Sequence, residues 1–192
     1  MSLFGKKSRS ERFEELAAQH ERAVYLTCLR MMSNREDALD CAQEAMLNAY
    51  RAFDRVEEEA ACKAWFVKIA HNVCVDQLRK RRNIVSLDSL REDGYDPADE
   101  KSLSPYARLE EKERMQLLKE AVADLSDEQR SMIVLRDFRN MSYEEIGEML
   151  NVPLGTVKSR IKRAREKIKK ILLQKTELFS ADSVIENEGR QK

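Results

Sequence analysis

The chain is poor in the residues that interrupt helices: glycine occurs five times and proline three times among 192 residues. Alanine, leucine, glutamate, lysine and arginine, which favour helices, are plentiful. Hydrophobic residues make up 42 % and charged residues 36 %, which is enough apolar material for helical cores beneath a very charged surface. We therefore predict an all-α fold, and the length allows one compact domain or two small ones.

Other absences exclude classes of function. No run of eighteen apolar residues is present, so we expect no membrane span. The N-terminal "MSLFGKKSRSERF" has basic residues without an apolar segment after them, which is not a signal peptide, and we expect a cytoplasmic protein. Only two histidines occur, with no glycine-rich phosphate loop and no G-x-S-x-G. We therefore expect no catalytic residues, no metal, no cofactor and no enzyme.

The four cysteines, Cys28, Cys41, Cys62 and Cys74, form no C-x-x-C pair, and no histidine stands at ligand spacing from them. We expect reduced thiols that are mostly packed in the interior. A redox or zinc role is the alternative.

The chain divides into four predicted parts. Residues 10–83 carry helical spacing of apolar residues, with a capping "SN" at 33–34. Residues 84–105 contain a glycine, two prolines, six acids and two bases, and are predicted to be a flexible acidic linker. Residues 106–174 are predicted to be helical again, with Pro105 at a helix start and capping boxes in "SDEQ" and "SYEE". Residues 175–192 are polar and are predicted to be a flexible tail.

The strongest single pattern is "SYEEIGEMLNVPLGTVKSRIKRAREKIKK", residues 142–170. A short helix, the turn "NVP" and a longer helix ending near Leu172 are typical of a helix-turn-helix. Val157, Ile161, Ala164 and Ile168 are predicted to form its buried stripe. Residues 154–170 carry eight bases and one acid in a chain of zero net charge. The predicted DNA-contacting residues are Gly155, Thr156, Lys158, Ser159, Arg160, Lys162 and Arg163. The alternative is a solvated lysine-rich face.

A second basic helix is predicted at "AACKAWFVKIAHNVCVDQLRKRR", residues 60–82. Its cations, among them Lys63, Lys68 and Arg79, favour contact with nucleic acid, and an aromatic side chain there can stack on an unpaired base. Trp65 fits either that surface or the core, and "RKRR" alone fits a solvated helix end.

Together these residues resemble a known family. "REDALDCAQEAMLNAYRAFDRV", "AWFVKIAHNVCVDQLRKRR" and "LSDEQRSMIVLRDFRNMSYEEIGEMLNVPLGTVKSRIKRAREKI" are similar, in this order, to the extracytoplasmic-function sigma factors, group 4 of the bacterial sigma-70 superfamily. The resemblance covers about residues 11–172. It implies a promoter-specificity subunit of RNA polymerase, with a region 2 domain followed by a region 4 domain.

The resemblance also implies partners and site residues. The helix "DALDCAQEAMLNAY" would dock on the clamp helices of the largest polymerase subunit through Asp37, Asp40, Gln43, Glu44 and Asn48, although such residues also suit a merely solvated face. Residues 128–138 with the first helix of the helix-turn-helix would bind the flap of the second-largest subunit. The helix-turn-helix would read the minus-thirty-five promoter element. The loop "VEEEAACKAW" and the helix after it would melt the minus-ten element, with Ala61, Cys62, Lys63, Trp65, Lys68, Asn72 and Arg79 as contacts. The acidic linker would run toward the RNA channel, or serve only as a tether.

The family is commonly held inactive by an anti-sigma factor, often linked to the membrane, and the resemblance implies such a partner here. Two departures stand out: Leu39 replaces a common acid, and the loop has Cys62 in place of a common glycine or serine. An autonomous helix-turn-helix repressor or activator is the alternative function, but it gives no account of residues 34–82. Transcription with purified polymerase separates the two, since a repressor does not start transcription.

Overall fold

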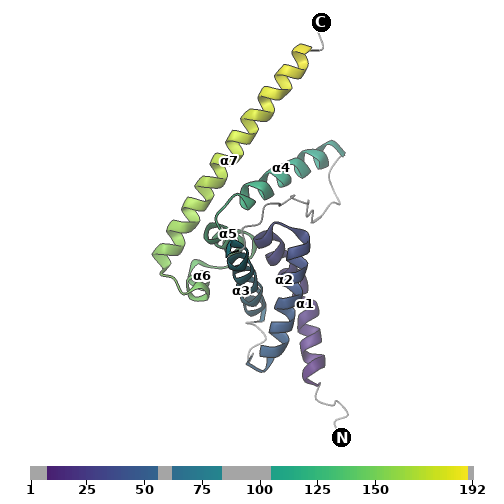
Figure 1. Ribbon diagram of the computed structural model, residues 1–192, viewed down its shortest axis with the longest axis vertical. Helices are drawn as coiled ribbons and strands as arrows, with labels where there is room; N and C mark the ends of the chain where they lie inside the picture. The colour runs from purple at the N-terminus through teal and green to yellow at the C-terminus, as the bar shows by residue number, and fades with distance from the viewer. Residues whose placement is uncertain (1–7, 56–61, 84–104, 190–192) are drawn as a thin grey trace. The chain divides into compact units, whose positions relative to one another are not determined.

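The computed structural model describes residues 8–55, 62–83 and 105–189, with side chains of the last range described from 113 to 174. Every regular element in these ranges is a helix, as the composition predicts. The chain divides into two compact units, residues 1–94 and 95–192, and the division lies inside the predicted linker. The loop 56–61 and the linker 84–104 lie outside the described residues (Figure 1).

The first unit contains α1 (Arg9–Met32), α2 (Arg35–Ala52), the short 3-10 helix η1 (Phe53–Arg55) and α3 (Cys62–Asn83). Ser33 ends α1 in the left-handed conformation, and the side chain of Asn34 caps α2 by accepting a bond from the Asp37 backbone N–H at 3.0 Å. The predicted "SN" boundary is therefore confirmed.

The core of this unit forms where α1, α2 and α3 pack on one another. The buried face of α2 is made of small residues, Ala38, Cys41, Ala45 and Ala49. Small side chains let the neighbouring helices come close, and larger residues from α1 and α3, such as Met31 and Phe66, fill the space between them. The remaining exposed faces of α2 and α3 are thus held in a fixed relation.

The second unit contains α4 (Pro105–Ala123), α5 (Asp127–Ile133), the π-helix η3 (Val134–Phe138), α6 (Tyr143–Leu150) and α7 (Leu154–Gly189). Both predicted capping boxes are present, at the starts of α5 and α6. The buried Arg130 guanidinium donates to the backbone carbonyls of Val122, Ala123 and Leu125, which satisfies the end of α4. These bonds fix the corner between α4 and α5.

The last helix differs from its predicted extent. We expect an end near Leu172, but α7 continues to Gly189 (Figure 1). The physical reason is that neither glycine nor proline occurs between Leu172 and Gly189, and the polar residues there are compatible with a helix. The predicted tail 175–192 is therefore helical as far as Gly189.

Candidate nucleic-acid interface

The helix-turn-helix is built by local signals in the sequence. Ser142 and Glu145 form the capping box of α6, and Asn151 ends α6 in the left-handed conformation with φ of 52°. The Val152 N–H then donates to the Gly147 carbonyl at 2.9 Å. A Cβ at Gly147 would meet the Val152 carbonyl oxygen at 3.0 Å, so this glycine lets the turn lie directly against α6. The turn therefore fixes the angle between α6 and α7.

The predicted stripe of α7 is buried: Val157, Ile161 and Ala164 have at most 1 % exposure, and Ile168 packs against the core. The opposite face is open to solvent at Gly155, Lys158, Ser159, Lys162 and Arg163. A Cβ added at Gly155 would meet nothing within 4 Å, so the fold itself does not require glycine there. This end of α7 is narrow and basic, a shape and charge that suit a DNA groove.

Several predicted contacts on α7 are engaged within the protein, and among them Lys162 lies 3.8 Å from the Glu166 carboxylate. Arg160 is half-buried, and its guanidinium lies 3.5 Å from the Glu128 carboxylate of α5. Thr156 is also half-buried, and its carbonyl accepts a bond from the Ser159 hydroxyl at 3.0 Å. These contacts orient the first turns of α7 and place Arg160 at the edge of the exposed face.

The structure brings four of the predicted minus-ten residues together on α3. At 100° per residue, Trp65, Lys68, Asn72 and Arg79 lie within one arc of the helix, opposite the buried Ala70 and Cys74. Trp65 is half-buried and packs edge-on against the buried Phe66 with ring centroids 5.0 Å apart. It is therefore both a core neighbour and a partly accessible aromatic surface.

Three other predicted contacts stand apart from this arc. Lys63 lies on the other side of α3, where it lowers the pKa of His20 on α1 together with the larger effect of burial. Cys62 has only 1 % exposure, so its thiol lies in the interior of the first unit, and its contact with minus-ten DNA stays a prediction. Cys62 packs in the core because it lies on the same face of α3 as the buried Phe66 and Val73, whereas Lys63 and Ala64 of the same turn are exposed. Ala61 lies outside the described residues.

The predicted polymerase-binding face of α2 is only partly free. Asp40, Gln43 and Glu44 are exposed, and Asn48 is half-buried. Asp37 instead forms an ion pair with Arg81 of α3, which ties the two helices together. Leu47, one turn from Gln43, is 57 % exposed and lies beside the predicted polymerase contacts.

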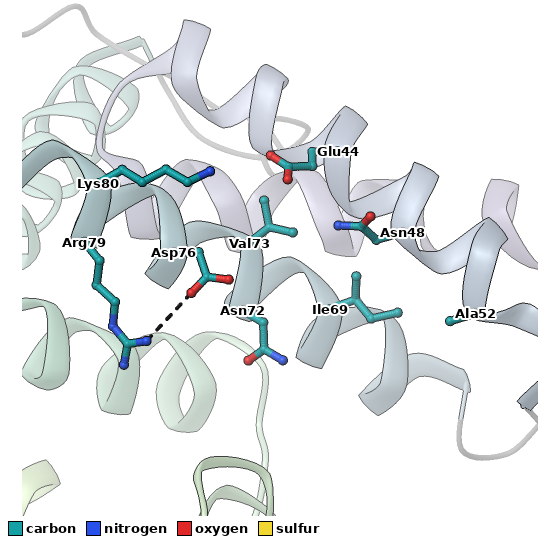
Figure 2. Close-up of a pocket in the computed structure, with 9 residues that line it drawn as sticks. All are labelled: Glu44, Asn48, Ala52, Ile69, Asn72, Val73, Asp76, Arg79 and Lys80. Atoms are coloured by element: carbon teal, nitrogen blue, oxygen red, sulfur yellow. Dashed lines mark ion pairs between the residues drawn. The ribbon is translucent and has the colours of Figure 1, made fainter.

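A groove with a volume of about 560 Å³ lies between α2 and α3. Figure 2 shows that Glu44 and Asn48 form its α2 wall and Asn72, Asp76 and Arg79 its α3 wall. Arg79 pairs with Asp76 at 3.7 Å. Predicted polymerase contacts and predicted minus-ten contacts thus share one groove, which the sequence alone does not reveal.

The second unit has an apolar groove of about 540 Å³ between α4, η3 and α7. Leu118, Val122, Phe138 and Ile168 contribute to its lining. Arg165 donates from Nε to the Asp137 carboxylate at 3.2 Å, and this hydrogen bond raises the Arg165 pKa. Asp137 and Arg165 therefore form a charged rim on one side of this apolar groove.

The cysteines are free and buried, as expected for packed thiols. Hydrogen bonds from Cys28 and Cys41, together with burial, raise the pKa of the Cys74 thiol. The described part of the chain contains no group of three or more His, Cys, Asp or Glu side chains arranged to hold a metal ion. None of its helices is long and apolar enough to cross a membrane.

Comparison with known proteins assigns the two units. A model described as Sigma-70 region 2 matches residues 16–84, and one described as Sigma-70, region 4 matches residues 115–168. The class is thus that of the sigma-70 transcription initiation proteins, and the helix-turn-helix lies in region 4.

Similarity to individual sigma factors identifies the subfamily within this class. The chain is 32 % identical over 178 residues to "ECF RNA polymerase sigma factor SigW" of Bacillus subtilis, with 87 % of this chain and 92 % of the relative covered. It is 32 % identical to "ECF RNA polymerase sigma factor SigE" of Mycolicibacterium smegmatis over 88 % of this chain and 64 % of the relative. The chain belongs to the extracytoplasmic-function RNA polymerase sigma factors.

A solved structure agrees with this assignment. The sigma factor RpoE of Bartonella quintana, solved in complex with the anti-sigma factor NepR, matches with a TM-score of 0.67 and 26 % identity. The match covers 84 % of this chain and 96 % of that one. Promoter-specific initiation of transcription is accordingly the function of this protein.

Proposed function

We propose that the protein, as a group 4 sigma factor, binds core RNA polymerase in the cytoplasm and reads a two-part promoter without catalysis of its own. The observation that carries this division of labour is the placement of the predicted contacts. Those for minus-thirty-five DNA line the exposed face of α7, whereas those for minus-ten DNA gather on α3. Two weak DNA-binding modules gain specificity when polymerase fixes their spacing, because each raises the effective concentration of the other.

In the second unit, Lys158, Lys162 and Arg163 attract phosphates and reach base edges in the major groove. Arg160, held by Glu128, borders that contact. The exposed Gly155 at the start of α7 allows the backbone of DNA to come close. This explains why a chain of zero net charge concentrates its cations in one segment.

In the first unit, the α3 face holds the separated minus-ten strand. Trp65 offers part of its ring for stacking, Asn72 offers donors and acceptors for a base edge, and Lys68 and Arg79 contact phosphates. Extracting a base from the stack costs a few kcal/mol, which these contacts offset.

The contacts with polymerase are likewise divided between the two units. The clamp helices of the largest subunit contact α2 at Asp40, Gln43, Glu44 and the exposed Leu47, while Asp37 supports that face through Arg81. The flap of the second-largest subunit contacts residues 128–138 and α6, and the apolar groove adjoins that surface at Asp137 and Phe138. An anti-sigma factor carried on a membrane protein competes for these surfaces. The structure of RpoE in complex with the anti-sigma factor NepR supports an anti-sigma partner.

The deciding experiment is transcription with purified core polymerase on a library of randomised promoters. We expect the full chain to start transcription at a two-part promoter, with Asn72→Ala altering the minus-ten preference and Arg163→Ala the minus-thirty-five preference. Lys170→Ala, also exposed on α7 but farther from its start, is the matched control. A chain that binds promoter DNA but never initiates would support a repressor instead.

Polymerase binding is tested separately with Leu47→Asp, and Ala18→Asp, which adds the same acid at an exposed position of α1, serves as its control. The proposal predicts weaker binding of core polymerase by the first variant alone. Equal binding by both would remove α2 from the clamp contact.

A further inference from the structure

Three of the four cysteines meet in the interior of the first unit, each on a different helix. Cys28 of α1, Cys41 of α2 and Cys74 of α3 are buried free thiols. The Cys74 thiol lies within hydrogen-bonding distance of both other sulfur atoms. Because Cys74 is 33 residues from Cys41 and 46 from Cys28 in the sequence, the packing of the three helices brings these sulfur atoms together.

The packing of α2 against α3 suits a bond between two of these thiols. A disulfide requires Cα atoms about 4.4–6.8 Å apart. On α2, Cys41 stands in a buried row of small residues with Ala38 and Ala45, and on α3 the buried Ala70 lies one turn before Cys74. Small side chains on both helices let the two backbones approach closely. The hydrogen-bonded sulfur atoms of Cys41 and Cys74 can therefore be joined with little movement of the helices.

The two thiols of this pair differ in reactivity. Cys41 has 3 % exposure, whereas Cys74 has none. The hydrogen bond with Cys74 lowers the pKa of the Cys41 thiol against the effect of burial, and the nearby Arg81 acts in the same direction as that bond. Hydrogen bonds with Cys28 and Cys41, together with burial, raise the pKa of Cys74, which therefore keeps its proton. Since the thiolate is the nucleophile, Cys41 is the residue that reacts first.

We propose that hydrogen peroxide oxidises Cys41 and that Cys74 then closes a reversible disulfide linking α2 to α3. The Cys41 thiolate attacks one peroxide oxygen, the O–O bond breaks, and a sulfenic acid and hydroxide form; the hydroxide takes up a proton to become water. The Cys74 sulfur then attacks the Cys41 sulfur, the S–O bond breaks, and the departing hydroxide leaves as water with the Cys74 proton. The two thiols lose two electrons, and the peroxide is reduced to two water molecules.

This disulfide joins two helices that carry different predicted contacts. The groove between α2 and α3 lies beside it, since Glu44 is one turn from Cys41 and Val73 is next to Cys74. Oxidation therefore fixes the spacing between the predicted polymerase face and the predicted minus-ten face, and a thiol reductant releases it. The modification belongs to the first unit and requires neither DNA nor polymerase.

Peptide mapping of the full chain tests the proposal independently of promoter reading. The folded protein is treated with hydrogen peroxide, its remaining thiols are alkylated, and it is digested with trypsin, which cuts after lysine and arginine. The four cysteines then fall in four separate peptides, residues 23–30, 36–51, 56–63 and 69–79. We expect peptide 36–51 linked to peptide 69–79, and a reductant should separate them. Absence of this pair, or a link between 23–30 and 69–79 in its place, overturns the proposal.

Cysteine-to-alanine variants identify the two partners. Cys41→Ala and Cys74→Ala should each abolish the linked peptides, whereas Cys28→Ala should retain them. Cys62→Ala is the matched control, because Cys62 is also buried on α3 but lies 12 residues, or about 18 Å, along the helix from Cys74. Loss of the link in Cys62→Ala or Cys28→Ala overturns the assignment. Circular dichroism should show the same helicity for all variants, which excludes pairing in an unfolded chain.

Oxidation of the same protein in urea separates pairing in the fold from random pairing. In an unfolded chain the shorter loops close more readily, which favours Cys28 with Cys41 and Cys62 with Cys74, 13 and 12 residues apart, over Cys41 with Cys74. We expect the link between Cys41 and Cys74 to dominate in the folded protein alone. The same mixture of pairs with and without urea overturns the proposal.

Discussion

The two basic helices, α3 and α7, differ in how densely their cations are spaced. The 22 residues of α3 carry six bases and one acid, and Arg79 pairs with Asp76 and Arg81 with Asp37 of α2. Residues 154–170 of α7 carry eight bases and one acid, and Arg160, Lys162 and Arg165 pair with acids of the second unit. Because both helices have internal ion pairs, the denser charge of α7 leads us to expect the stronger long-range attraction for phosphate in the second unit.

The difference implies a sequence of contacts at the promoter. Under the proposed function, we expect the second unit to supply salt-sensitive attraction to duplex DNA, and the first to act once strands separate and bases become accessible. Predictions that alter one unit at a time test this contrast.

The largest expected effect is on the core of the second unit. Ile161→Asp buries a carboxylate at a site with 1 % exposure, and we expect a loss of about 3 kcal/mol or more of folding free energy. Circular dichroism of the full chain should show part of the helical signal melting early while the first unit remains folded. Lys162→Asp, at the exposed neighbouring position, should keep the fold. An unchanged melt for Ile161→Asp would contradict the packing of α7.

The second largest effect is expected on recognition of the minus-thirty-five element. Arg163→Ala should weaken binding to the minus-thirty-five element by about 1–3 kcal/mol and relax its specificity, if the guanidinium contacts a base. Lys158→Ala should instead weaken binding to all sequences and lower the salt slope by about one. Footprints measured at several salt concentrations separate the two results. Unchanged protection by Arg163→Ala would count against this face as the reading surface.

The sequence predicts the fold well where local signals decide it. The caps at Asn34, Ser126 and Ser142 and the buried stripe at Val157 and Ile161 all depend on residues a few positions apart. Tertiary partners are different. The pairing of Asp37 with Arg81 joins residues 44 apart, and the burial of Cys62 follows from the direction in which α3 enters the core. Periodicity within one helix does not contain that information.

The same reasoning explains the candidate site. Exposure of the α7 face follows from its own periodicity, so it was predictable. The groove between α2 and α3 depends on how the two helices cross. The exposure of Leu47 depends on the packing of the other helices, which leave this side of α2 uncovered. Neither property is encoded in the spacing of one segment.

The next largest effect is expected from acid, which should destabilise the first unit more than the second. His71 has 3 % exposure, and burial lowers its pKa, so the unfolded chain binds a proton near pH 6.5 that the folded chain does not. Stability of the first unit should therefore fall as pH falls below about 6.5, by at most about 1.4 kcal/mol per pH unit for this residue. The second unit has no histidine and is the internal control. Hydrogen exchange followed in both units between about pH 7.5 and 5.5 gives the measurement, and equal loss in both would contradict the assignment.

Two glycines in the second unit should respond oppositely to alanine. Gly147→Ala places a Cβ 3.0 Å from the Val152 carbonyl oxygen and should destabilise the helix-turn-helix by about 1 kcal/mol or more. Gly155→Ala meets nothing and should stabilise the helix by about 0.5–1 kcal/mol, while weakening promoter binding where DNA approaches that turn. Thermal melts and footprints on the same proteins give both results. A stabilised Gly155→Ala that binds DNA normally would show that close approach at this position is unnecessary.

The smallest expected effect concerns the start of α6. The Glu145 carboxylate accepts a bond from the Ser142 backbone N–H at 2.6 Å, which lowers its pKa below the ordinary 4.5. A lowered carboxyl pKa stabilises the fold above about pH 4.5, and this contribution is lost as pH falls through the folded value. Because the side chain is exposed, we expect less than about 1 kcal/mol. The equivalent box at Ser126 uses Gln129, whose amide oxygen accepts from the Ser126 N–H at 3.3 Å without an ionisable group. Glu145→Gln should therefore keep the cap and lose this acid sensitivity, as measured by the melting of the second unit between about pH 6 and 3.5. A Gln variant as acid-sensitive as the unaltered chain would place the titrating group elsewhere.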